Sequence, residues 1–111
     1  MAWIVETLNA AVDAELQVLP ADLRARFVYI SRLIEEFGLE RMRAPHVKHL
    51  RGPLWEMRMR GRDGIARAIY VVANYQRVVV VRVFIKKRQT TPSREIDLAL
   101  RRAKELLKWL K

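Results

Sequence analysis

The sequence predicts an α+β fold, in which a small antiparallel-rich sheet packs with an N-terminal helical hairpin and a C-terminal helix. Three strand-like runs that carry arginine follow one another between residues 54 and 85, and segments with helical apolar periodicity flank them. The 111 residues suffice for one hydrophobic core, so we expect a single domain spanning residues 1–111. This order of elements predicts helices on one face of the sheet and a free face for a ligand.

The first forty residues predict a short strand and the two helices of the hairpin. Residues 3–8 are typical of a strand, and Asn9 is a suitable N-cap for a helix that runs to about Val18. From Asp22 to Phe37 the apolar residues recur at spacings of four and three, as on one side of an amphipathic helix: Leu23, Phe27, Ile30, Ile34 and Phe37.

The middle of the chain predicts three antiparallel strands after an irregular basic segment. Residues 39–53 show no periodicity, whereas we expect strands at 54–60, 65–74 and 78–85. The connections between these strands are short enough for tight turns. The last run, VVVVRVFI, is almost entirely β-branched, so we expect it to be the central and most buried strand.

The C-terminal segment predicts one further helix. Thr91 and Pro92 are suited to its start, because proline is favoured in the first helical turn. Its apolar residues form a single stripe, while its other faces are rich in arginine and lysine. The stripe consists of Ile96, Ala99, Ala103, Leu106 and Leu110.

The composition excludes several classes of protein. The chain has no cysteine, so disulfides and thiolate metal sites are excluded. No apolar run approaches the length of a membrane span, and the N-terminus lacks the basic start and apolar stretch of a signal peptide. We therefore expect a cytoplasmic protein without a membrane partner.

The net charge of +10 is concentrated in the second part of the chain. Residues 1–40 carry three arginines and seven acidic residues, whereas residues 41–111 carry nineteen basic and five acidic residues. Segregation of charge to one region favours binding of a polyanion such as RNA. The alternative is a solvated basic surface without a ligand.

The run LWEMRMR indicates how these charges are presented. Strand alternation places its side chains on two faces. One face can close a core and carries Trp55, Met57 and Met59; the other carries Leu54, Glu56, Arg58 and Arg60. Guanidinium groups held by a stiff strand are suited to a phosphate chain. Glu56 either holds a neighbouring arginine in place or is a surface residue.

Several conspicuous residues are expected to have structural roles. We expect Trp55 and Phe84 to anchor the core, and strand alternation favours a core position for Tyr70 as well. His46 and His49 could reach the edge of a site, but we expect both to be loop residues without a catalytic role. A zinc site needs a third ligand with suitable spacing, and none is found, so no metal site is expected.

Four blocks between residues 50 and 99 stand out: Leu50-x-Gly52-x-Leu54-Trp55-Glu56-Met57-Arg58, Gly64-Ile65-x-Arg67-x-x-Tyr70, Phe84-x-Lys86-Lys87 and Thr91-Pro92-x-x-Glu95-Ile96-x-x-Ala99. In this order they resemble the phage-derived branch of the RelE/HigB-like toxins, within the RelE/ParE superfamily, over roughly residues 2–108. The resemblance implies the RelE-like fold and a type II toxin that cleaves mRNA, commonly on the ribosome, without a metal or other cofactor. It also implies a protein antitoxin, often with a helix-turn-helix domain, that covers the basic surface.

The resemblance further implies roles for individual residues. Arg58 falls where ribosome-dependent relatives carry a lysine proposed as general base, and Arg67 matches their phosphate-stabilising arginine. Lys86 or Lys87 lies near their arginine proposed as general acid. These four are the catalytic candidates, and an Arg67→Ala variant is expected to abolish toxicity with the fold intact. The remaining candidates for RNA binding are Arg60, Arg62, Arg82 and Arg88.

Two departures from the family pattern leave other functions open. Arg58 would be a poor general base, because the pKa of arginine is above 12. Relatives also place a C-terminal tyrosine on the RNA, and none follows Tyr75 in this sequence. A non-enzymatic toxin that inhibits DNA gyrase, and a basic RNA-binding module without catalysis, therefore remain alternatives. A metal-dependent nuclease is not favoured, because the acidic residues of the basic half form no close cluster.

Overall fold

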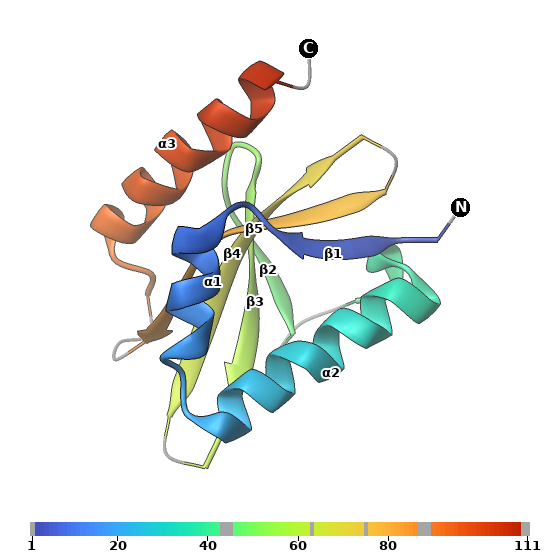
Figure 1. Cartoon of the computed structure of the whole chain (residues 1–111), viewed down its shortest axis with the longest axis vertical. Helices are drawn as coiled ribbons and strands as arrows, with labels where there is room; N and C mark the ends of the chain where they lie inside the picture. Colours follow the sequence, from blue (N-terminus) through green and yellow to red (C-terminus); the bar gives the residue numbers. More distant parts are fainter. Residues whose placement is uncertain (1, 43–45, 63, 75, 87–89, 110–111) are drawn as a thin grey trace.

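The structure, a computed structural model, describes residues 2–42, 46–62, 64–74, 76–86 and 90–109 (Figure 1). Its strands are β1 (Ile4–Thr7), β2 (Val47–Arg51), β3 (Leu54–Arg60), β4 (Ile65–Ala73) and β5 (Arg77–Lys86). Its helices are α1 (Ala10–Gln17), α2 (Ala21–Phe37) and α3 (Ser93–Trp109), with a 3-10 turn at Leu39–Arg41. The predicted α+β fold with an N-terminal helical pair and a C-terminal helix is confirmed.

The five strands form one sheet in the order β1-β5-β4-β3-β2. The neighbours are antiparallel except for β1, which pairs in parallel with the first part of β5. The central strand is β4, so the prediction that the valine-rich run is central is wrong. A run of β-branched residues indicates a strand that is buried on both faces of the sheet, but it does not give the position of the strand in the sheet. The strand β5 is buried on both faces although it lies next to the central strand.

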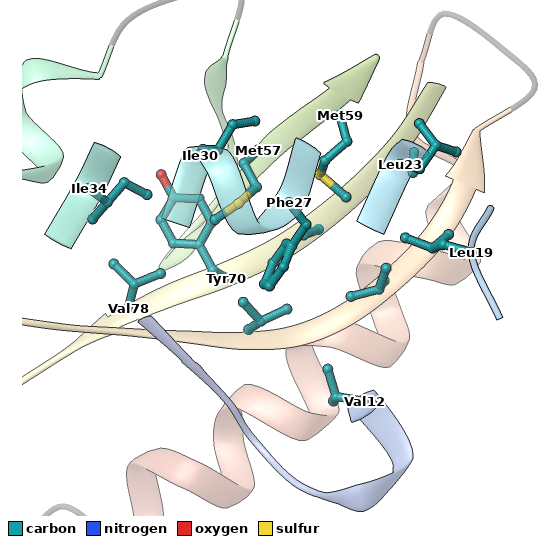
Figure 2. Close-up of a cluster of buried hydrophobic side chains, with 14 residues drawn as sticks. Val12, Leu19, Leu23, Phe27, Ile30, Ile34, Met57, Met59, Tyr70 and Val78 are labelled. Carbon is teal, nitrogen blue, oxygen red and sulfur yellow. The ribbon is translucent and has the colours of Figure 1, made fainter. Parts of the chain in front are cut away.

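Helices cover both faces of the sheet, so the prediction of a single covered face is also wrong. In Figure 1, α2 lies at the lower right and α3 at the upper left of the sheet. The first face packs under α1 and α2, and Figure 2 shows part of that cluster: Val12, Leu19, Leu23, Phe27, Ile30, Ile34, Met57, Met59, Tyr70 and Val78. On the second face Ala99 and Ala103 of α3 meet apolar residues of β3, β4 and β5: Leu54, Ile69, Val71, Ala73, Val79, Val81 and Phe84.

Local sequence explains the N-terminal helices. The Asn9 side chain accepts a hydrogen bond from the backbone N–H of Val12 at 3.1 Å, which confirms it as the N-cap of α1. The predicted apolar stripe of α2 is buried as far as Ile34, but Phe37 is 55% exposed. Gly38 follows with a φ of +91°, a conformation that other residues rarely adopt, and turns the chain away from the helix axis.

The strand β2 falls inside the segment that we expected to be irregular. It is an edge strand in which both faces remain largely exposed, so its sequence has no apolar alternation to reveal it. His49 lies in this strand rather than in a loop, and its ring contacts Trp55 with centroids 4.9 Å apart. Trp55 is 39% exposed at this margin of the sheet, whereas Phe84 and Tyr70 are buried as predicted.

Within the part of the chain that the structure describes, no helix combines the length and apolar character needed to cross a membrane.

Candidate nucleic-acid interface

The candidate site lies on the α3 face of the sheet, at the end that the apolar stripe of α3 does not reach. The strands are paired so that Arg58 is opposite Arg67, Arg67 is opposite Phe84, and Ile65 is opposite Lys86. Directly opposed residues point to the same face of a sheet. Three of the predicted catalytic side chains, Arg58, Arg67 and Lys86, therefore share one face.

A buried ion pair forms the floor of this region. Arg67 is 1% exposed and pairs with Glu56, which is fully buried. The other carboxylate oxygen of Glu56 accepts a hydrogen bond from the Thr91 hydroxyl at 2.8 Å. Glu56 therefore ties β4 and the segment before α3 to β3, which settles the role that the sequence left open. Burial lowers the pKa of Arg67 from its ordinary value.

The position of Arg67 corrects one expectation. We expected Arg67→Ala to leave the fold intact, but the substitution would leave the Glu56 carboxylate buried without its guanidinium partner. Removing one member of a buried ion pair lowers the free energy of unfolding by about 3–5 kcal/mol. In this conformation the Arg67 side chain lies beneath the surface against Glu56 and is not an exposed phosphate ligand.

Three other cations surround the buried pair. Arg58 is partly exposed, and Arg60, two residues on, is exposed on the same face. Lys86 is 8% exposed, and no described residue accepts a hydrogen bond from its Nζ. An ammonium group in such a position is favourable only with an anionic or polar partner. The arrangement is suited to holding a phosphate group.

A cavity of about 610 Å³ opens beside Lys86, between the end of β5 and the start of α3. Its walls combine basic, hydroxyl and apolar groups, which is the mixture that a nucleotide needs for its phosphate, ribose and base. The lining residues are Phe84, Ile85, Lys86, Thr90, Pro92, Arg94 and Glu95. Arg94 was not among the candidates from sequence, because the basic faces of a helix cannot be ranked without the fold.

The other sequence candidates fall in different places. Arg62 is exposed in the turn between β3 and β4, where its backbone N–H donates to Asp22 Oδ2 at 2.7 Å. Arg82 is engaged by two carboxylates, Glu95 of α3 at 2.6 Å and Glu15 of α1 at 2.8 Å, so it joins two helices to β5. The positions 87 and 88, Lys87 and Arg88, lie outside the described residues.

The candidate site contains few groups that could accept a proton. Tyr70 lies on the opposite face of the sheet in the core, where burial raises its pKa, so it does not replace the missing C-terminal tyrosine. His46 lies beside Arg58, whose backbone N–H donates to the His46 carbonyl at 2.8 Å. The described residues include no group of three or more potential metal-ligating side chains. The chemistry that this geometry supports is charge stabilisation at a phosphate.

Solved structures share this architecture. The E. coli toxin RelE, in a double arginine-to-alanine variant in the free state, aligns with a TM-score of 0.65 at 21% identity, over 92% of this chain and 98% of that one. The RelE of an archaeal RelE–RelB complex from Pyrococcus horikoshii OT3 aligns with a TM-score of 0.57 at 25% identity, over 79% of this chain and 99% of that one. The class defined by the element order and the sheet is therefore the RelE-like toxin fold.

The sequence profile of the phage-derived Gp49-like proteins matches residues 14–104. This chain belongs to that family. A search of curated proteins found no match.

Proposed function

We propose that this protein is the toxin of a type II toxin–antitoxin pair and acts in the cytoplasm as a metal-free endoribonuclease on ribosome-bound mRNA. The observation that carries the proposal is the group of cations, Arg58, Arg60 and Lys86, around the buried Arg67–Glu56 pair. The family and the shared fold support the same conclusion.

The proposed reaction is attack of a ribose 2′-hydroxyl on the adjacent phosphorus, with transfer of the hydroxyl proton to solvent water, departure of the 5′-oxygen and formation of a 2′,3′-cyclic phosphate. Arg58 and Arg60 would bind the phosphate oxygens, whose negative charge grows in the pentacovalent transition state. Lys86 or Lys87 would neutralise or protonate the leaving 5′-oxygen. Arg58 is unsuited to remove the hydroxyl proton, so general-base catalysis by this residue is not expected. In this proposal most of the catalysis comes from positioning of the RNA and from stabilisation of the charge on the phosphate.

The proposed partner is a protein antitoxin, for which the RelE–RelB complex among the structural neighbours is the precedent. An acidic segment of the antitoxin would cover the cations of the sheet face and exclude RNA. We further propose that the antitoxin carries a helix-turn-helix domain, as the family resemblance implies.

The test is induced expression in a bacterial host, with mRNA 5′ ends mapped within minutes. Wild type should produce new 5′ ends inside coding regions and stop growth. Arg58→Ala should remove both effects without lowering thermal stability, because the side chain is partly exposed and makes no ion pair with a described residue. The matched control is Arg101→Ala, an exposed arginine of α3 that lies outside the site.

Absence of new 5′ ends in arrested cells would contradict the ribonuclease. Two observations favour the alternative of a toxin that inhibits DNA gyrase: the arginine at position 58 where relatives place a base, and the absence of a tyrosine after Tyr75. It predicts arrest with DNA-damage signalling and intact mRNA. Growth without arrest or cleavage would favour the third possibility, a basic RNA-binding module without catalysis.

A further inference from the structure

A basic groove runs along the edge of the sheet, from Arg58 toward the N-terminal half of α2. It consists of two adjoining depressions that share Arg26 and Arg60. The first, of about 200 Å³, is lined by Arg26, His46, Arg58, Arg60 and Ile65. The second, of about 530 Å³, is lined by Ala21, Asp22, Arg26, Arg60, Gly61 and Arg62.

The groove exists because β3 is longer than the strand that covers it. The pairing of β2 with β3 ends at Val47 opposite Met57, so Arg58 to Arg60 continue past the end of β2. Their outer edge is then open except at Arg58, where the backbone N–H donates to the His46 carbonyl. The exposed guanidinium of Arg60 thus stands at a sheet edge that a ligand can approach.

The start of α2 is fixed against this edge. Asp22 Oδ2 accepts the backbone N–H of Arg62, and the two segments approach so closely that a Cβ on Gly61 would lie 2.5 Å from Asp22 Oδ2 and 2.7 Å from Leu23 Cδ2. A side chain at position 61 would have to displace the Asp22 and Leu23 side chains. Arg26, one turn beyond Asp22, therefore lies on the part of α2 that packs against this edge, and it lines both depressions together with Arg60.

The charge of the groove is almost entirely positive. Among the described residues, no carboxylate forms an ion pair with Arg26, Arg58, Arg60 or Arg62. Among the described residues that line the groove, Asp22 is the one acidic residue, and its Oδ2 already accepts a backbone N–H. Arginine presents its donors in a planar fork that fits two phosphate oxygens, so the groove is suited to a chain of phosphates.

We propose that Arg26 forms a second phosphate-binding site, next to the Arg60 guanidinium that binds the scissile phosphate, and holds the RNA backbone as the strand leaves the cleavage site beside Arg58. This inference rests on the proposed function and adds a residue from the acidic N-terminal part of the chain. Arg26 was not predicted as an RNA ligand, because it lies in residues 1–40, where acidic residues outnumber basic ones.

The test is the affinity of the purified full chain for single-stranded 2′-O-methyl RNA, which cannot be cleaved because its 2′-hydroxyl is blocked. Fluorescence anisotropy would be measured at several salt concentrations, with a twelve-nucleotide strand and with a dinucleotide. Loss of one phosphate contact lowers the slope of log affinity against log salt by about 0.7. Arg26→Ala should therefore weaken binding of the longer strand about fivefold near 0.1 M salt, and leave dinucleotide binding unchanged.

The matched control is Arg32→Ala, which removes an equally exposed arginine from the same helix but outside the groove. Arg26 contacts the Tyr29 ring at 5.4 Å, so the melting temperature of each variant is measured to show that the fold is retained. Equal affinities of Arg26→Ala and Arg32→Ala for the longer strand would overturn the second site while leaving the ribonuclease intact. A wild-type protein that binds neither RNA would also overturn the second site, whereas the ribonuclease itself is tested by the mapping of mRNA 5′ ends in cells.

Discussion

The two faces of the sheet use the same strands for different purposes. Under α1 and α2, the face is apolar from one end to the other and contributes Met57, Met59, Ala66, Ala68 and Tyr70 to the larger core cluster. Under α3, only half of the face is apolar. The other half carries the Arg67–Glu56 pair together with Arg58 and Lys86.

The difference shows how a small domain can hold charged groups at a site. Burial of apolar area stabilises by about 25 cal/mol per Å², and the first face supplies this along its whole length. The second face can then place cations where a core would otherwise continue. The fixed strands beneath hold those cations in register, so an anion meets groups that need little reorganisation.

The most severe test of this comparison is to remove Arg67, which among the described residues is the buried cation of the charged half with a buried carboxylate partner. We expect Arg67→Ala to lower the free energy of unfolding by about 3–5 kcal/mol, because Glu56 would be left buried without its guanidinium. Urea denaturation followed by circular dichroism measures the change.

The matched control for Arg67→Ala removes both charges. Arg67→Met combined with Glu56→Met should recover most of the stability, since apolar replacement of a buried pair is often neutral or better. The same double variant should still lose RNA cleavage, because Thr91 no longer has its acceptor. A single variant that costs less than about 1 kcal/mol would show that the pair does not hold this half of the face together.

A substitution on the apolar face should have a comparable or slightly smaller effect on stability and none on RNA binding. Ile30 is fully buried in the cluster under α2 (Figure 2). Ile30→Ala should cost about 2–5 kcal/mol in urea denaturation, from lost burial and the cavity that remains. The affinity of the folded fraction for 2′-O-methyl RNA should not change. Weaker RNA binding by fully folded Ile30→Ala would show that packing on the apolar face affects the RNA-binding face of the sheet.

The contact between the two helical layers provides a pH-dependent test. Glu15 of α1 accepts hydrogen bonds from Arg102 of α3 at 2.9 Å and from the backbone N–H of Val83 at 3.1 Å. Burial raises the pKa of Glu15, but these hydrogen bonds and the charges of Arg82 and Arg102 outweigh it, so the pKa is lowered overall. The stabilisation from Glu15 is therefore present above its ordinary pKa, near 4.5, and is lost as the pH falls through the lower folded value.

We expect Glu15→Gln to lower the free energy of unfolding at pH 7 by about 1–3 kcal/mol. The loss of stability on acidification below about pH 4.5 should be shallower in the variant than in wild type. Thermal unfolding across this pH range measures both effects. The control Glu36→Gln, an exposed carboxylate of α2, should leave stability at pH 7 unchanged, and parallel acid curves for wild type and Glu15→Gln would contradict the assigned role.

The sequence predicted the strands and helices of the apolar face well, because strict periodicity accompanies burial on one side. It placed β3 at its observed bounds and identified the buried stripe of α2. It missed β2, whose exposed residues carry no periodic signal, and the covering of the second face by α3. Alternation put Glu56 and Arg58 on one face, but only the pairing of β3 with β4 shows that Glu56 meets Arg67.

The smallest expected change in stability comes from Arg60, yet it distinguishes the two kinds of cation on the charged face. Arg60 is exposed and forms no ion pair with a described residue, so Arg60→Ala should change the free energy of unfolding by no more than about 0.5 kcal/mol. The affinity of this variant for single-stranded RNA should nevertheless fall, and the slope of log affinity against log salt concentration should decrease by about 0.7. Arg32→Ala on α2 again serves as the exposed-arginine control. If Arg60→Ala destabilised the fold as Arg67→Ala does, the exposed cations would be structural too. If it changed neither stability nor binding, the open half of this face would not be the RNA surface.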